Sequence, residues 1–234
     1  MPKSPQEFAD RITHLKADLV GQGRRVQTML ERAFESVFAR DNEQAQRVVE
    51  SDDIIDAVDV EIEKRSVALL SDATAVGAAL QPEHLRMVLT IVKINNELER
   101  IADVATAVAD LVPSMAAEKL TVPETHRVIT NSVVGIIRDS VLSLERNDGQ
   151  LAKVVLASED AVEAFKTAIL RDAQVQVSTG RMPVDQAFLL HELATQCEIM
   201  ASHCTNIAEQ VLYAATGTIV RHMGGHWQEV PPKP

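Results

Sequence analysis

Apolar residues recur every three or four positions along six long segments of this 234-residue chain, and short stretches rich in Pro, Gly, Asn or Asp separate the segments. That spacing places the apolar side chains on one face of an α-helix. The expected helices cover about 6–39, 43–70, 82–112, 123–145, 150–177 and 183–215. Only 9 Gly and 9 Pro are present and aromatic residues reach just 3%, which is typical of long packed helices rather than of sheets. The sequence therefore predicts an all-α fold.

The second half of the chain repeats the first. A shift of 99 residues places Glu99 on Glu198 within the third and sixth helices, and a shift of 107 places Asp52 on Glu159 within the second and fifth. Acidic residues thus fall on acidic residues in two separate segments, which indicates that one set of helices was duplicated. The tail after Gly217 carries Gly and Pro too densely to continue a helix, so it is expected to be extended or loosely packed.

Two pairs of carboxylates are spaced four residues apart on successive helices: Asp52 and Asp56 on the second, and Glu99 and Asp103 on the third. Residues at this spacing are neighbours on a helix surface. The stripe expected to face inward on the third helix begins with apolar residues and then becomes polar; its members are Leu85, Leu89, Val92, Asn96, Glu99, Asp103, Thr106 and Asp110. If the two helices pack antiparallel, the four carboxylates converge.

Buried carboxylates are costly unless a cation meets them. One interpretation is therefore a metal ion, with iron, zinc, manganese and magnesium all compatible with carboxylate ligands. The alternative interpretation is that the acidic side chains lie at the edge of the helix contact, in water, and pair with Arg65, Arg86 or Arg100. The spacing does not decide between the two.

The corresponding residues in the second half are Glu159 and Glu163 on the fifth helix, and Glu198 and Ser202 on the sixth, with His203 adjacent. Serine is a poor metal ligand compared with aspartate, so a second site is expected to be weaker or remodelled.

The charge and the motifs exclude several classes of function. With 23 Lys and Arg against 34 Asp and Glu, the net charge is −11 and nucleic acid is not expected as a partner. No catalytic motif such as GxSxG, GxGxxG or HExxH occurs, so an enzyme is not expected. No leader or membrane-spanning segment is visible, and Cys197 and Cys204 lie too far apart on one helix to bridge, which favours a cytoplasmic protein with free thiols.

Three segments resemble motifs of the PhoU family, the phosphate-transport accessory and regulatory proteins. They are ESDDIIDAVDVEIE, NNELERIADVATAVADL and ASHCTNIAEQVLYAATGTIVRH. The first resembles the family's D-x-x-x-D helix, and the other two resemble its two signatures in the correct order. The resemblance extends over about residues 8–222.

The resemblance implies two tandem, similar three-helix bundles at 6–113 and 121–217, followed by a tail at 218–234, in a protein that is often a homodimer. It also implies metal sites built from E(D)-x-x-x-D pairs. Transferred to this chain, the first site is Asp52, Asp56, Glu99 and Asp103, and the second is Glu159, Glu163, Glu198 and His203. The second motif departs from the family pattern, because Ile199 and Ser202 stand where the family has arginine and aspartate.

In function, the resemblance implies a negative regulator of phosphate uptake and of phosphate-starvation signalling. Such a protein is an adaptor between a sensor histidine kinase and the ATPase subunit of the phosphate ABC transporter, at most peripheral to the membrane. Two alternatives remain open at this point: an accessory protein of another phosphate permease, and a structural helical bundle without bound metal.

Overall fold

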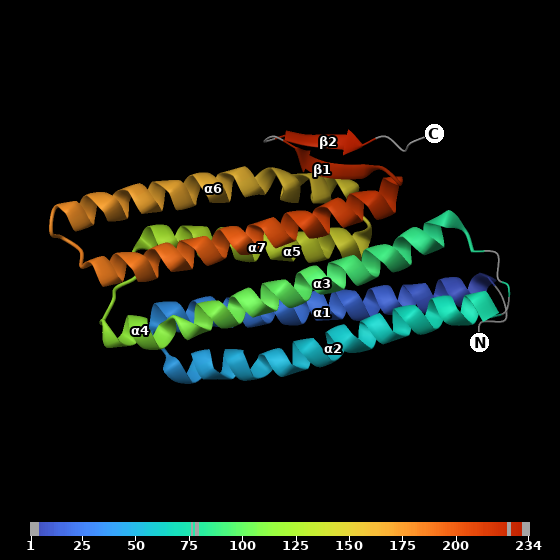
Figure 1. Cartoon of the computed structure of the whole chain (residues 1–234), viewed down its shortest axis with the longest axis horizontal. Coiled ribbons are helices and arrows are strands. Elements are labelled where there is room, and N and C mark those ends of the chain that lie inside the picture. Colours follow the sequence, from blue (N-terminus) through green and yellow to red (C-terminus); the bar gives the residue numbers. More distant parts are fainter. Residues whose placement is uncertain (1–4, 76, 78–79, 224–225, 231–234) are drawn as a thin grey trace.

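The computed structural model describes residues 5–75, 77, 80–223 and 226–230 (Figure 1). Its elements in chain order are α1 (Pro5–Ala39), α2 (Asn42–Ala75), α3 (Pro82–Asp110), α4 (Val112–Ala117), α5 (Glu124–Arg146), α6 (Gly149–Ser178), α7 (Val184–Thr216), β1 (Ile219–Met223) and β2 (His226–Val230). All six predicted long helices are present, which confirms the all-α prediction for the body of the molecule.

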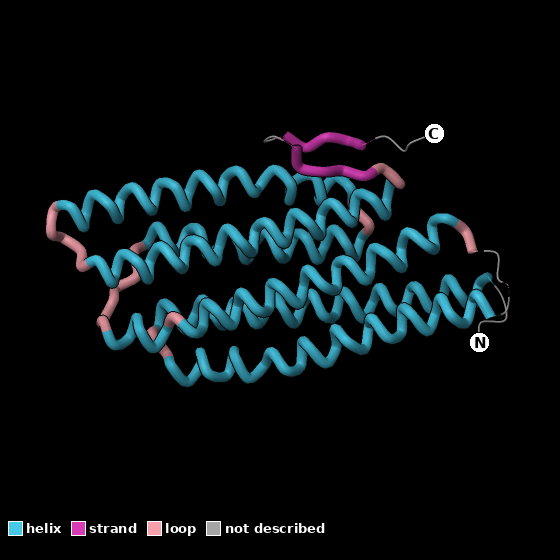
Figure 2. Tube along the Cα trace, in the orientation of Figure 1, coloured by secondary structure: helices cyan, strands magenta, loops and turns pink. Residues whose placement is uncertain are grey.

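The six long helices run along the long axis of the molecule in two groups of three (Figures 1 and 2). Helices α1, α2 and α3 pack against one another, and α5, α6 and α7 form the second group. The groups meet where α3 lies beside α7 and α1 lies beside α5. We refer to them as the first and second bundles.

Side-chain caps explain where the chain turns between helices. The Asp41 carboxylate accepts a hydrogen bond from the backbone N–H of Gln44 at 3.0 Å, as expected for an N-cap at the start of α2. Asp148 caps α6 in the same way, and Asn147 before it adopts the left-handed conformation, with φ of 53°, that ends α5. The turn signals read from the sequence therefore correspond to real caps.

The buried apolar side chains form one continuous cluster that runs through both bundles. The contact between α1 and α5 is especially close at Gly23, where an added Cβ would lie 2.7 Å from Cγ2 of Val141. The two bundles are therefore packed together rather than merely linked. None of the helices within the described ranges has the length and apolarity needed to cross a membrane.

Two elements differ from the sequence expectation. The short helix α4 follows α3 directly, and Pro113 occupies one of its first two positions, where proline is tolerated. The tail was expected to be extended or loosely packed; β1 and β2 are extended, and they also pair antiparallel, which was not expected, with Ile219 opposite Val230 and Val220 opposite Glu229. Strand β1 also contacts α7, so part of the tail is ordered against the second bundle.

Candidate metal centre

The four predicted ligands of the first site share the surface where α2 meets α3. Burial, together with the negative charges of Asp56, Asp103 and Asp53, raises the pKa of Asp52 to about 6. Burial likewise raises the pKa of Glu99, with added repulsion from carboxylates on both helices that exceeds the opposing effect of Arg100. The carboxylates of α2 and α3 are therefore close enough to repel one another across the helix contact.

The prediction that this stripe of α3 faces inward is wrong. Leu85 and Leu89, which begin it, are 41% and 53% exposed. The face that packs into the core is a neighbouring series that is almost entirely apolar, and it includes Val88, Ile91, Ile94, Leu98, Ile101, Ala105 and Val108. Two series with helical spacing overlap on α3, and burial selects the one without carboxylates. Glu99 and Asp103 lie beside the core rather than in it.

Two of the three arginines considered as partners for these acidic residues have other contacts, whereas Arg100 acts on Glu99 through its charge. Arg65 pairs with Asp18 at 2.6 Å, and Arg86 pairs with Glu83 at 3.4 Å. Within the described part of the chain, no ion pair joins a lysine or arginine to any of the four predicted ligands. The acidic surface therefore keeps an excess of negative charge.

The donor chemistry of this surface fits a metal ion, because carboxylate oxygens are the ligands that hard cations prefer and a cation would relieve their repulsion. The side chains do not converge on a common point, however: in the described ranges, no three His, Cys, Asp or Glu residues are grouped closely enough to hold an ion. Metal binding at Asp52, Asp56, Glu99 and Asp103 stays a prediction.

Asp59 extends the acidic surface and was not among the predicted site residues. Its side chain accepts a hydrogen bond from Nδ2 of Asn95 on α3 at 2.6 Å, and the same Nδ2 also lies 2.9 Å from the Asp59 carbonyl oxygen. Burial raises the pKa of Asp59, with contributions from Glu63 and Asp56. Its position three residues after Asp56 on α2 is the signal in the sequence that identifies it.

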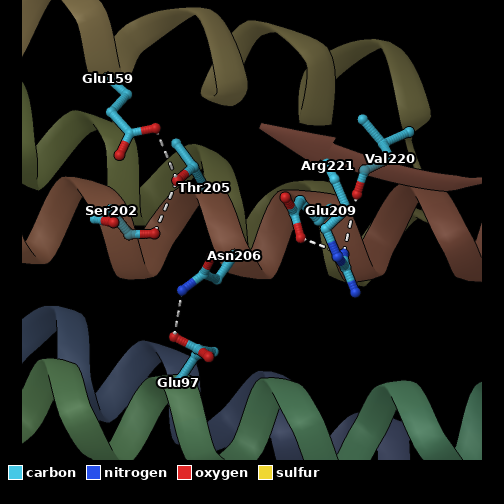
Figure 3. Close-up of polar contacts among 8 residues, drawn as sticks. All are labelled: Glu97, Glu159, Ser202, Thr205, Asn206, Glu209, Val220 and Arg221. Carbon is cyan, nitrogen blue, oxygen red and sulfur yellow. Dashed lines mark hydrogen bonds and ion pairs between the residues drawn. The ribbon is translucent and has the colours of Figure 1, made fainter. Parts of the chain in front are cut away.

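The predicted residues of the second site lie in different surroundings. Lys166 on α6 forms an ion pair with Glu198 on α7. The Oε2 atom of Glu159 accepts a hydrogen bond from the hydroxyl of Thr205 at 3.3 Å (Figure 3). Glu163 is exposed. The surface between α6 and α7 therefore already carries a positive charge, which the Lys166 ammonium supplies.

His203, the last predicted ligand of the second site, contacts the first bundle instead. Its Nδ1 lies 2.8 Å from Oε2 of Glu97 on α3. Nδ2 of Asn206 donates to the same oxygen at 3.1 Å, as Figure 3 shows. Burial alone would raise the pKa of Glu97, but these two hydrogen bonds and the nearby positive groups outweigh it and lower the pKa. Glu97 thus connects the two bundles, a role that its sequence position did not reveal.

Two further polar features complete the surroundings. Arg221 on β1 forms an ion pair with Glu209, whose side chain is only 8% exposed, and this contact holds the hairpin on α7 (Figure 3).

Cys197 and Cys204 are both buried free thiols, as predicted, and burial raises the pKa of each to about 12. Neither thiol is therefore a reactive thiolate at neutral pH.

Two similar three-helix bundles, with acidic residues at matching positions on the second and third helix of each, define a duplicated all-helical protein. The PhoU domain model matches residues 19–112 and 128–211, one match in each bundle. The chain belongs to the PhoU family. Proteins of this family are regulatory, in agreement with the expectation that the chain is not an enzyme.

Relatives match along nearly their whole length. The chain is 30% identical over 214 residues to the phosphate-specific transport system accessory protein PhoU homolog of Aquifex aeolicus, covering 90% of this chain and 94% of that one. It is 26% identical over 212 residues to PhoU homolog 1 of Thermotoga maritima, covering 90% and 89%.

The crystal structure of the phosphate transport system regulatory protein PhoU from Streptococcus pneumoniae superposes with a TM-score of 0.84. At 19% identity, it covers 92% of this chain and all (100%) of that one. At this identity the likeness shows the fold alone.

Proposed function

We propose that this chain is an accessory and regulatory protein of phosphate transport that lowers uptake and starvation signalling when phosphate is plentiful. The observation that carries the proposal is the pair of PhoU domain matches, one in each bundle, together with the correspondence to relatives named as phosphate-specific transport system accessory proteins. The chain acts through a bundle surface that contacts other proteins, and it catalyses no reaction.

Deletion of the gene in its host tests this proposal. In high phosphate, the deletion strain is expected to express alkaline phosphatase or the phosphate transporter at a level normally seen only in starvation. A plasmid copy of the wild-type gene is expected to restore repression. Unchanged expression in the deletion strain contradicts the proposal.

The proposed partners are the ATPase subunit of the phosphate ABC transporter and a sensor histidine kinase, which the chain meets in the cytoplasm as a homodimer. Support comes from the family and from the acidic character of the chain, whose charge of −11 favours basic protein surfaces as partners. Crosslinking in cells grown in high and low phosphate, followed by mass spectrometry, identifies the partners. Recovery of a different phosphate permease instead would assign the chain to that transporter.

We also propose that the carboxylates of α2 and α3 bind a metal ion, either iron, zinc, manganese or magnesium. The mutual repulsion of Asp52, Glu99 and Asp103, without a lysine or arginine paired to them, supports this. Elemental analysis of the purified full chain is expected to find metal that is lost in Asp103→Ala. The matched control is Asp110→Ala, which removes an exposed carboxylate from the end of the same helix. Metal-free wild-type protein after incubation with each ion contradicts the proposal.

A further inference from the structure

The surfaces between α2 and α3 and between α6 and α7 correspond residue by residue. The 107-residue shift that aligns α2 with α6 places Asp59 on Lys166, and the 99-residue shift that aligns α3 with α7 places Glu99 on Glu198. The glutamate is kept in both halves, whereas the residue facing it changes from an acid to a base. The exchange of Asp59 for Lys166 therefore brings a positive charge to this glutamate in the second bundle.

The structure shows the consequence of that change. In the first bundle, the counterpart of Lys166 is Asp59, whose carboxylate accepts a hydrogen bond from Nδ2 of Asn95 at 2.6 Å and brings no positive charge to Glu99. In the second bundle, the Lys166 ammonium contacts the Glu198 carboxylate, and the two side chains are only 22% and 32% exposed. An ion pair in such partly buried surroundings is screened less than one on the open surface.

The remaining ligands that a metal would need in the second bundle are also engaged or missing. Ser202 occupies the position of Asp103 and has no carboxylate. Glu159 is hydrogen-bonded by Thr205, and His203 is hydrogen-bonded to Glu97 on the other bundle. Only the exposed Glu163 is left of the predicted set.

We infer that the second bundle holds no metal ion, because Lys166 supplies the cation that neutralises Glu198. The residues do not fit the metal that the family implies for this bundle. A divalent ion would have to displace the ammonium from Glu198 and would be repelled by it at short distance. In this chain, metal binding is therefore confined to the first bundle, an inference that rests on the proposed metal site there.

The test is to restore the acidic pattern in the second bundle of a full-length protein whose first site is disabled by Asp52→Asn and Asp103→Asn. In that background, Lys166→Asp with Ser202→Asp recreates the charges of Asp59 and Asp103. Titration with Mn²⁺, followed by electron paramagnetic resonance of the free ion, is expected to give a Kd at least tenfold lower than in the background protein.

The matched control is Lys153→Asp with Ser202→Asp in the same background, because Lys153 is an exposed lysine on the same helix. It changes the net charge equally without opening the Lys166–Glu198 pair, and Mn²⁺ affinity is expected to stay within about twofold of the background. If circular dichroism shows that the Lys166→Asp protein does not fold, Lys166→Gln with Ser202→Asp removes the ammonium with a smaller perturbation and is expected to change the Kd in the same direction.

Equal Mn²⁺ affinity in the folded Lys166 variants and the Lys153 control overturns the inference. It is also overturned if the background protein already binds Mn²⁺ and loses that binding on Glu198→Gln. Failure of the wild-type chain to bind any metal is a separate result: it defeats the proposed metal site of the first bundle, while a gain of Mn²⁺ affinity on removal of Lys166 still supports the role of the lysine.

Discussion

The surfaces between α2 and α3 and between α6 and α7 are formed by corresponding helices of the two PhoU repeats but carry different charges. In the first, Glu99 faces other carboxylates; in the second, its counterpart Glu198 faces Lys166. These residues lie at the edge of the helix contacts, where a change of charge costs little packing. Duplication has therefore preserved the fold in both halves while allowing the chemistry of the two surfaces to diverge.

Several buried positions, in contrast, have the same residue type in both halves. Ala102 and its counterpart Ala201 are both fully buried, and so are Ala109 and Ala208. These small residues belong to α3 and α7, which lie beside each other at the junction of the bundles. A larger side chain at any of them would have to be accommodated in a closely packed interior, so packing constrains both copies alike.

Removal of metal gives the largest expected difference between the bundles. At a metal concentration about a hundredfold above its Kd, binding stabilises a folded protein by about 2.7 kcal/mol. Chelation with EDTA is therefore expected to lower the Tm by about 5–10 °C. Hydrogen exchange measured by mass spectrometry is expected to become faster in α2 and α3 and to stay unchanged in α6 and α7.

The same measurement on Asp103→Ala is the control, since this variant has no proposed site to empty and EDTA is expected to leave its Tm unchanged. Faster exchange in α6 and α7 of the wild-type protein upon chelation would show that the second bundle also depends on a metal ion, and the contrast between the two bundles would disappear.

The contact between the bundles gives the next largest effect. Glu97→Ala is expected to lower the free energy of unfolding by about 2 kcal/mol, because it leaves His203 and Asn206 without their common acceptor. Urea denaturation followed by circular dichroism measures the change. Glu61→Ala, at an exposed position of α2, is expected to change stability by less than about 0.5 kcal/mol. Equal effects of the two variants would mean that the Glu97 contact contributes nothing to holding the bundles together.

The sequence predicts the long helices because these depend on local signals. Helical spacing of apolar residues located all six, and caps such as Asp41 at the start of α2 lie in the Asn- and Asp-containing stretches that separate the predicted helices. The hairpin formed by β1 and β2 was missed, since its position depends on the contact between Arg221 and Glu209 on α7. No local pattern records such a contact.

The candidate site is only partly predictable for a related reason. The pairs at Asp52 and Glu99 were found by spacing, but the face that α3 buries was assigned wrongly because two series with the same spacing overlap on it. The partner of His203 is Glu97 on α3, 106 residues away, and the partner of Glu198 is Lys166 on α6, 32 residues away, so only tertiary packing reveals them.

Packing between α1 and α5 allows a test of whether the bundles depend on each other. Gly23→Ala is expected to lower the free energy of unfolding by about 1 kcal/mol, since the clash with Val141 outweighs the gain in helix propensity. Gly21→Ala is the matched control two residues away, where the nearest atom to an added Cβ is 3.8 Å distant. It is expected to raise stability by about 0.5–1 kcal/mol. If Val141→Ala does not relieve the effect of Gly23→Ala, the clash is not its cause.

The smallest expected effects have opposite signs in the two bundles. In EDTA, Asp52→Asn is expected to raise the Tm by about 1–2 °C at pH 7, because like charges at helical spacing each cost a few tenths of a kcal/mol. The folded-state pKa of Asp52 is raised to about 6, above that of an unfolded chain, so its stabilising contribution is complete below about pH 4 and is lost as the pH rises through 6. The gain from Asp52→Asn is therefore expected at pH 7 and absent at pH 4.

Glu198→Gln is the corresponding change in the second bundle, and it is expected to lower the Tm by about 1–3 °C at pH 7, because it removes the partner of the partly buried Lys166 ammonium. Differential scanning calorimetry of both variants at pH 4 and pH 7 measures the contrast. A rise in Tm for Glu198→Gln would show that this glutamate experiences net repulsion, as Glu99 does, and that Lys166 does not neutralise it. The two surfaces would then be electrostatically alike, and the sign of the Glu198→Gln effect alone decides the point.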